Sequence, residues 1–319
     1  MRIERYKTEY ADEWNKFVDG SKNGTFLFNR GYMDYHSDRF KDHSLMFYND
    51  RNRLVALLPA NESGRTYYSH QGLTYGGYVL SPHIHGKEML SIFEQTLEYL
   101  RDQGFEVFYY RQIPYPYQQV PSEEDEYVLW RNNAEFVACG LSSCICVGGC
   151  MSGKNLVSRH RIQYERNKLS RNGYCVKHDA DIRLFWPILE DNLRNRHNVS
   201  PVHRIEEMML LKERFPKNIV CCVAVNSKGE AEAGTILYLS KQVVHVQYMS
   251  ASENGRRTRA LNFLMGELID YYSKLNKYLY FDFGVSTEHD GTILNEGLLN
   301  FKERLGGRGI VYKTWRINI

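Results

Sequence analysis

The sequence predicts an α+β fold in which a mixed sheet occurs twice, once in each half of the chain. The first observation is the order of elements. Each half has helices, three antiparallel strands joined by short turns, a helix, a strand, another helix and a last strand. The second observation is the length, because 319 residues suffice for two domains. We therefore expect two tandem domains, residues 1–150 and residues 151–319.

In the first half, the clearest element is the segment 86–104, whose apolar residues recur at the spacing of a helix packed on a sheet. An Asn-Asp-Arg-Asn group between two strand-like runs indicates a hairpin turn. The expected helices are 10–18, 86–104 and 123–133, and the expected strands are 44–50, 53–61, 65–70, 105–113 and 141–149.

The second half repeats this plan, with a loop at 251–259 that contains Gly255 and three arginines between the last strand of its meander and the next helix. The expected helices are 155–173, 181–197, 201–216, 260–276 and 294–306. The expected strands are 174–179, 218–226, 230–240, 242–250, 278–284 and 310–318. The two halves share this order of elements but no repeat of residues.

Composition limits the class of protein. With 43% hydrophobic and 25% charged residues the chain is globular, and a net charge of +3 is too small to indicate a DNA-binding protein. The N-terminus has no apolar segment of a signal peptide, and no apolar run approaches the roughly 18 residues of a membrane span. Seven unevenly placed cysteines favour a reducing compartment. We expect a cytoplasmic protein without a membrane span.

Four cysteines lie close together in the sequence and are candidates for a metal site: Cys139, Cys144, Cys146 and Cys150. Zinc sites usually contain pairs of cysteines separated by two to four residues on turns. Cys144 and Cys146 instead alternate with apolar residues along an expected strand. We therefore expect small hydrophobic side chains and no metal.

Two motifs resemble those of nucleotide-binding proteins. Gly148-x4-Gly153-Lys154 lacks the Ser or Thr of a phosphate-binding loop, since Asn155 follows, and the surrounding elements are not those of a nucleotide-binding sheet. It is better interpreted as a linker. Asp-Phe-Gly at 282–284 lacks the other protein-kinase motifs. Asp282 either caps the following loop or points into a cleft at the end of its strand.

Basic residues gather on the helix that follows the linker and at the loop 251–259. The helix carries Lys154, Arg159, Arg161, Arg166, Lys168 and Arg171, which form either a solvated face or a face toward an anionic ligand. In the loop, arginines at a helix start would suit a diphosphate.

This order of elements, with its Gly/Arg turn, resembles the acyl-CoA N-acyltransferase (GNAT) fold. The duplicated arrangement resembles the Fem family of peptidoglycan interpeptide-bridge transferases and their bacterial FemAB-like relatives. The resemblance is carried by GTFLFNRGYMDYH, QGLTYGGY, SRHRIQYERNKLSRNG, RNRHNVSPVHRIEEMMLLKERFP, VQYMSASENGRR, YFDFGVSTEHDG and LNEGLLNFKERLGGR.

The resemblance implies that the second half holds acetyl-CoA or another acyl-CoA, with no metal. One strand edge would bind the pantetheine, and the loop would bind the diphosphate. The loop departs from the family pattern because it lacks the second glycine. The implied cofactor-binding residues are Gln247, Tyr248, Met249, Gly255, Arg256, Arg257, Thr258 and Arg259.

Acyl transfer to an amine needs a base for the amine and an acid for the leaving group. Tyr248 is the candidate acid, or alternatively a core residue. His203, Asp282 and Glu288 are the candidate bases. The candidate substrate-binding residues are His197, Arg159, Arg161 and Lys302. Lys302 is alternatively one partner of a buried pair with Glu303.

The resemblance thus implies an N-acyltransferase that moves an acyl group such as acetyl from acyl-CoA to an amine on a sugar, nucleotide-sugar or cell-envelope precursor. A Fem-type transferase that uses aminoacyl-tRNA on a peptidoglycan precursor is the first alternative, and tRNA is then a partner. The pair of long helices that often accompanies tRNA use is not apparent in this sequence. A non-catalytic binding module on the same fold is the second alternative.

Overall fold

A computed structural model describes residues 1–148, 159–197 and 199–319, without the side chains of residues 159–162 and 196–197. The chain forms two compact units. Unit 1 contains Met1–Leu141, Thr287–Ile293 and Val311–Ile319, and unit 2 contains Ser142–Ser286 and Leu294–Ile310. The expected domain boundary at residue 150 lies outside the described residues and stays a prediction. The two compact units are not continuous in sequence, because two segments near the end of the chain belong to unit 1.

Unit 1 contains a four-stranded antiparallel sheet in the order β1 (Arg2–Arg5), β3 (Leu45–Tyr48), β4 (Leu54–Leu58) and β7 (Val79–Leu80). A second set of strands runs in the order β17 (Arg308–Asn318), β8 (Val107–Arg111), β6 (Thr66–Tyr68), β5 (Asn61–Ser63) and β2 (Lys41–Asp42), with β6 and β8 parallel. The expected strand 53–61 is thus two strands, β4 and β5, in different sheets. Pro59 lies between them and cannot donate to a strand ladder.

The core of unit 1 lies between these strands and its helices. The helices are α1 (Ala11–Gly20), α2 (Arg30–Met33), α3 (Gly86–Asp102) and α4 (Glu124–Arg131). Helix α3 buries Met89, Ile92, Phe93, Leu97 and Leu100, so the apolar spacing of this segment correctly predicted its inward face.

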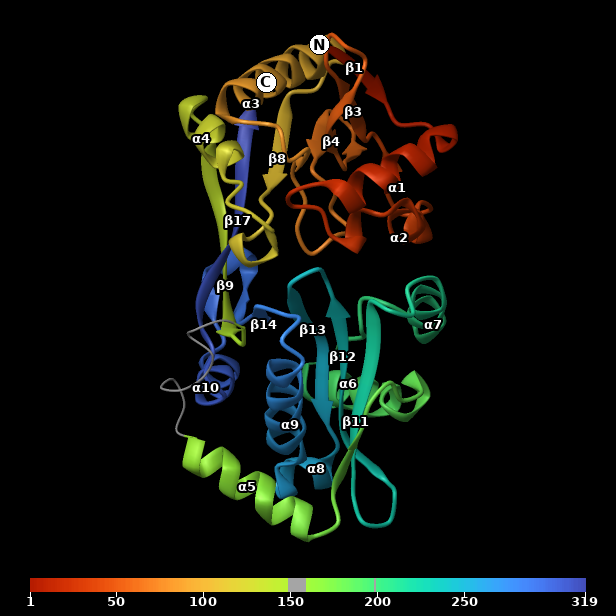
Figure 1. Ribbon diagram of the computed structural model, residues 1–319, viewed down its shortest axis with the longest axis vertical. Coiled ribbons are helices and arrows are strands. Elements are labelled where there is room, and N and C mark those ends of the chain that lie inside the picture. The colour runs from red at the N-terminus through yellow and green to blue at the C-terminus, as the bar shows by residue number, and fades with distance from the viewer. Residues whose placement is uncertain (149–158, 198) are drawn as a thin grey trace. The chain divides into compact units, whose positions relative to one another are not determined.

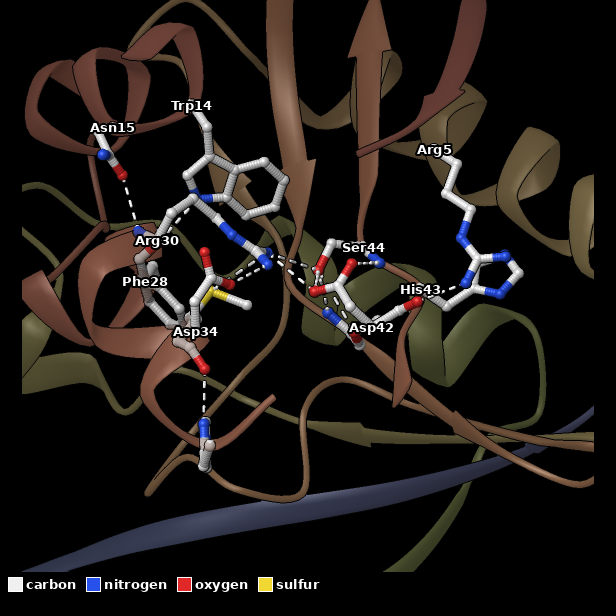
Figure 2. A network of polar contacts seen from close by, with 12 residues as sticks. Arg5, Trp14, Asn15, Phe28, Arg30, Asp34, Asp42, His43 and Ser44 are labelled. Atoms are coloured by element: carbon white, nitrogen blue, oxygen red, sulfur yellow. Dashed lines mark hydrogen bonds and ion pairs between the residues drawn. The ribbon is translucent and has the colours of Figure 1, made fainter. Parts of the chain in front are cut away.

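One polar network in unit 1 is buried (Figure 2). The Arg30 side chain is 4% exposed, and its guanidinium donates to Asp42 Oδ2 at 2.9 Å and contacts Asp34. It also lies over the Tyr6 ring, 3.8 Å from the centroid. The loop before α2 is held by Trp14, whose indole N–H donates to the Phe28 carbonyl at 2.7 Å.

Unit 2 is built on the meander β11 (Ile219–Val225), β12 (Ala231–Leu239) and β13 (Val243–Ala251), with β10 (Cys175–Lys177) at the outer edge. Strand β14 (Tyr280–Val285) lies parallel to β13 and antiparallel to part of β9 (Glu135–Cys146). Strands β15 (Thr287–Glu288) and β16 (Ile293–Leu294) pair with each other.

Helices cover both faces of the meander. Helix α9 (Ala260–Lys274) packs on one face and buries Phe263, Leu264 and Leu268 there (Figure 1). Helix α6 (Trp186–His197) packs on β12 and β13, where Trp186 contacts Tyr248. The other helices are α5 (Arg159–Arg171), α7 (Ile205–Arg214), α8 (Glu253–Thr258) and α10 (Glu296–Arg304).

Three further observations concern the expectations above. The segment 251–259 is not an open loop, because α8 occupies most of it. Among the described residues, no group of three or more His, Cys, Asp or Glu side chains could hold a metal, and Cys150, Gly153, Lys154 and Asn155 lie outside those residues. In the described part of the chain, no helix has the length and apolarity needed to cross a membrane.

Candidate active site in unit 2

The sheet of unit 2 opens between its two parallel strands. Pairing of β13 with β14 comprises Val243 with Tyr280, Val244 with Phe281 and His245 with Asp282, and it ends there. Beyond this point β13 continues along β12 to Ala251, whereas β14 continues along β9, where Val285 pairs with Ser142. Among the residues that the structure describes, the edge of β13 that faces β14 therefore has no strand partner after His245, and such an edge can bind an extended ligand.

A β-bulge lies at this opening. Ile236 pairs with Tyr248 and Leu237 with Val246, so Gln247 is the extra residue of β13. A bulge residue leaves the ladder, which makes its backbone N–H available to a ligand. The side-chain Oε1 of Gln247 is buried and has no hydrogen-bond partner among the described residues. An N–H donor of a ligand would satisfy it.

The bulge also decides which side chains share a face. Val244, Val246 and Met249 pack into the core beneath α9. With one extra residue at position 247, His245 and Tyr248 both lie on the opposite face, where Tyr248 meets Trp186 of α6.

Tyr248 and His203 form a hydrogen-bonded pair. The Tyr248 hydroxyl lies 2.7 Å from Nδ1 of His203 and 3.4 Å from its backbone N–H. The backbone N–H donates to the hydroxyl, and in the tautomer of His203 with its proton on Nε2 the hydroxyl donates to Nδ1. Burial raises the pKa of Tyr248 to about 12, so the phenol stays protonated at neutral pH. The pair can therefore hold a proton for transfer to a leaving group.

Asp282 is 0% exposed and lies at the centre of a second polar cluster. Ser142 Oγ donates to its Oδ1 at 2.6 Å, and the backbone N–H of Gly284 donates to the same oxygen at 3.0 Å. Nδ1 of His245 lies 3.0 Å from Oδ2. A carboxylate with these contacts and no solvent exposure is a partner for His245 rather than a group that itself reaches an amine.

Lys302 of α10 is buried beside this cluster. It is 1% exposed, and its ammonium donates to the carbonyls of Gly284 and Val285, each at 2.7 Å. Burial lowers the pKa of Lys302 to about 8, while the nearby Asp282 acts in the opposite direction. The expected pair with Glu303 is not among these contacts. Lys302 instead fixes the backbone where β14 leaves the sheet.

The segment that was expected to bind a diphosphate closes around Glu232. This residue is 3% exposed, and it accepts hydrogen bonds from Asn254 Nδ2 at 2.6 Å, Thr258 Oγ1 at 2.9 Å and Tyr174 Oη at 2.7 Å. Burial raises the pKa of Glu232, but these hydrogen bonds and one from Asn226 outweigh it and hold the pKa below its usual value. The carboxylate therefore stays charged.

The cations of this segment are also engaged. Arg257 pairs with Glu253, and Arg259 pairs with Glu165. Arg256 donates to the Ala251 carbonyl at 2.9 Å. The N-cap Ser252 accepts the N–H of Gly255 at 3.0 Å, so one donor of the short helix α8 is used as well.

Residues 157–301 match the GNAT acetyltransferase domain family. The structure is similar to FemX, with a TM-score of 0.72 and 9% identity over 100% of this chain and 98% of FemX. It is also similar to L-PGS from Bacillus licheniformis, with a TM-score of 0.61 and 15% identity over 98% of this chain and 93% of L-PGS.

A tandem GNAT protein from the clavulanic acid biosynthesis pathway is similar too, with a TM-score of 0.53 and 11% identity over 99% and 98% of the two chains. At these identities the likeness shows a shared fold. No curated protein matches the chain. Residues 157–301 thus match a GNAT domain by sequence, and the whole chain shares its fold with FemX and the tandem GNAT protein. The predicted fold class, a mixed α/β fold, is confirmed.

The GNAT match of residues 157–301 raises the question of whether the residues present fit CoA. The open edge of β13 and the unpaired Oε1 of Gln247 fit an extended acyl-donor arm. A diphosphate needs free N–H groups or cations at the following turn. In this chain, the turn instead surrounds the charged Glu232, and its arginines pair with carboxylates or a carbonyl. Arg257 and Arg259 are exposed in their pairs, and ion pairs at the surface are weak, so a diphosphate would bind this turn only by displacing Glu253 or Glu165 from them.

The structure of unit 2 does not test four of the predicted residues, which stay predictions. Glu288 is exposed and belongs to unit 1. The side chains of Arg159, Arg161 and His197 lie outside the described part of the structure. Arg166, which follows on the same helix, binds Glu267 at 2.7 Å and Asp270 at 3.3 Å on α9, so its charge stabilises helix packing.

Sequence reasoning did not select His245 or Ser142. His245 was one of several scattered histidines, and Ser142 one residue of an apolar strand. His245 and Ser142 are 37 and 140 residues away from Asp282 in the sequence, and strand pairing brings them into contact with it. The signal available in the sequence was the Asp-Phe-Gly at the end of β14, which draws attention to this strand end.

Proposed function

We propose that the protein transfers an acyl group from an activated donor to an amine at the opening between β13 and β14. The observation that supports this most directly is the open, bulged edge of β13, because it can hold an extended acyl arm next to a protonated tyrosine. The N–H of the bulge residue Gln247 would stabilise the oxyanion that forms when the amine attacks the acyl carbon.

In this proposal Tyr248 protonates the leaving group. His203 orients the phenol through the 2.7 Å hydrogen bond, and water returns a proton to the phenol after each turnover. The acceptor is an amine on a sugar, nucleotide-sugar or cell-envelope precursor, as the sequence indicated. An acyl thioester such as acetyl-CoA is the donor proposed first.

A second donor is favoured by one specific observation. The turn after β13 packs around the charged Glu232, so a donor without a diphosphate, such as an aminoacyl ester on tRNA, suits this turn better. The reaction at the acyl carbon is the same in both cases, and the Fem-type alternative therefore differs only in the donor.

The experiment tests both donors on the purified full chain. Melting temperature is measured with acetyl-CoA from micromolar to millimolar concentration, and transfer is measured with acetyl-CoA or alanyl-tRNA against glucosamine, UDP-glucosamine and an alanyl-lysine dipeptide. A donor that binds raises the melting temperature with concentration. Transfer from neither donor to any amine, without a shift in melting temperature, would contradict the proposal.

The matched variants are Tyr248→Phe and Tyr271→Phe. Removal of the Tyr248 hydroxyl should lower kcat by about 100-fold with little change in donor KM, because the acid acts only in the transition state. Tyr271 lies on α9 and is 43% exposed, so the same change there should leave kcat unchanged. Equal kcat values for the two variants would remove Tyr248 from the mechanism.

A further inference from the structure

Two histidines of unit 1 are buried side by side, away from the residues of the proposed transfer. His36 is 2% exposed and His70 is 3% exposed, and their rings stack with their centroids 5.2 Å apart. The Phe40 ring lies 4.9 Å from His36 and 5.7 Å from His70, and the Tyr35 ring stacks on His36 at 4.3 Å. The two imidazoles therefore lie in an aromatic cluster with almost no contact with water.

This histidine pair has ring nitrogens that the fold leaves unsatisfied. Nδ1 of His70 is buried and has no hydrogen-bond partner among the residues that the structure describes. Nδ1 of His36 donates to the Met33 carbonyl at 2.6 Å, so the lone pair of the neutral ring lies on Nε2. When the His70 ring is protonated, its Nδ1 carries a proton, and an N–H that is buried without an acceptor is costly.

The surroundings of the pair also disfavour a positive ring. Burial lowers the pKa of His70 well below its ordinary value. Burial lowers the pKa of His36 as well, although its backbone contacts act in the opposite direction. Three of the charged groups that act on the two rings are basic and one is acidic: Arg30, Arg39, Arg111 and Asp38. Both rings are therefore neutral in the folded chain at neutral pH.

A third buried histidine of unit 1 shows what His70 lacks. His43 is also 2% exposed, but its Nδ1 contacts the Glu62 carboxylate and its Nε2 lies 2.9 Å from the Tyr99 hydroxyl. A carboxylate accepts a hydrogen bond from a protonated imidazole, so His43 has an acceptor for a second proton. In the described part of the chain, no carboxylate has such a contact with Nδ1 of His70.

His70 begins the segment 70–77, which contains no helix or strand. Its φ of +69° lies in the left-handed region, which is unfavourable for a histidine. The Arg111 guanidinium holds the segment by donating to the carbonyls of Gln71 and Leu73, at 3.2 and 3.0 Å. The Asn61 side chain accepts the N–H of Gln71 at 2.8 Å. These hydrogen bonds can break while the neighbouring strands stay paired.

We propose that His36 and His70 form an acid-sensitive switch, in which protonation of the two rings opens the segment 70–77 while the rest of unit 1 stays folded. In the closed form, two adjacent positive rings would repel each other, and His70 would hold a proton without an acceptor. In the open form, water solvates both rings, which then bind protons at their ordinary pKa of about 6.5. The open form therefore binds more protons, and its population rises as the pH falls below about 6.5.

Hydrogen-exchange mass spectrometry of the full chain between about pH 7 and pH 5 tests the switch, with rates corrected for the intrinsic effect of pH on exchange. In the wild-type chain, peptides of the segment 70–77 should lose protection by about 10-fold or more. Each histidine that is neutral only in the closed form contributes up to about 10-fold for each pH unit below 6.5. Peptides of α3 should stay protected over the same range.

The test variant is His36→Gln combined with His70→Asn, since asparagine tolerates a positive φ. It has neither titrating ring, so the segment 70–77 should show the same corrected protection at both ends of the pH range. His83→Asn is the matched control, because His83 is exposed and lies outside the segment, and it should behave as the wild-type chain. An acid-dependent loss in the double variant equal to that of the wild-type chain would overturn the inference, and so would a wild-type segment whose protection does not change with pH.

Proton–nitrogen NMR of the histidine side chains gives a readout that needs no variant. In the wild-type chain, the His70 ring should stay neutral as the pH falls through about 6.5, and it should become protonated only together with the loss of protection in the segment 70–77. A protonated His70 ring in a segment that is still protected from exchange would show that the closed form tolerates the charge, and the switch would be refuted.

Discussion

At the scale of single residues, Arg30 illustrates a charge that stabilises rather than reacts. Its guanidinium is buried between Asp34, Asp42 and the Tyr6 ring (Figure 2). We expect Arg30→Gln to lower the free energy of unfolding by about 3 kcal/mol, because removing one partner of a buried pair costs more than the pair contributes. Urea titration measures the change.

The matched control for that variant is Arg183→Gln. Arg183 is exposed and pairs with Asp181 on the surface, where an ion pair contributes little. Its urea midpoint should stay close to that of the wild-type chain. An Arg30 variant with the same midpoint as this control would show that the buried network does not stabilise unit 1.

Lys302 predicts a pH dependence of stability. Its pKa is about 8 in the folded chain and close to the ordinary 10.5 when unfolded, because burial disfavours the ammonium. Between pH 8 and pH 10.5 the unfolded chain keeps the Lys302 proton and the folded chain loses it. The free energy of unfolding therefore rises as the pH increases from 8 toward 10.5. The gain should approach about 3 kcal/mol.

Lys302→Met provides the comparison, since it has no group that titrates. As the pH rises from 7 to 10, the free energy of unfolding of the wild-type chain should increase relative to that of the variant. Urea titrations at each pH measure it. A difference that stays constant over that range would mean that the folded pKa is not depressed.

At the scale of elements, the helix α8 depends on the absence of a side chain at Gly255. A Cβ there would lie 2.0 Å from the carbonyl oxygen of Glu232, which is backbone and cannot move aside cheaply. We expect Gly255→Ala to cost about 2 kcal/mol or more through this overpacking. Gly297→Ala is the control, because the nearest atom to its Cβ is 3.8 Å away in α10. Thermal unfolding of the two variants should therefore differ, and equal melting temperatures would contradict the packing.

The positions of helices could be predicted from the sequence, whereas the pairing between distant strands could not. Apolar spacing located α3 and α9 to within a few residues, because one helix face must be buried whatever it packs against. The segment 251–259 was wrongly predicted to be an open loop. The prediction gave weight to its three arginines and missed a short helix that is capped at its N-terminus. The bulge at Gln247 and the pairing of Ser142, His245 and Asp282 could not be predicted, because they depend on register between distant strands.

At the scale of the whole molecule, the chain does not divide into two successive halves. Unit 1 takes Thr287–Ile293 and Val311–Ile319 from the end of the sequence. The last segment pairs with β8, Thr314 opposite Arg111 and Ile317 opposite Phe108, and it buries Ile317 in the core of unit 1. The first 141 residues are therefore incomplete without the last nine.

This arrangement predicts where a C-terminal deletion acts. Removing residues 311–319 exposes an edge of β8 and takes Ile317 out of the unit 1 core, so backbone amides of β8 should lose protection in hydrogen-exchange mass spectrometry. Amides of β11 and β12 in unit 2 have their own partners and should keep theirs. Ile317→Ala should produce a smaller loss in the same peptides. Loss of protection that begins in β11 and β12 while β8 stays protected would contradict the assignment of this segment to unit 1.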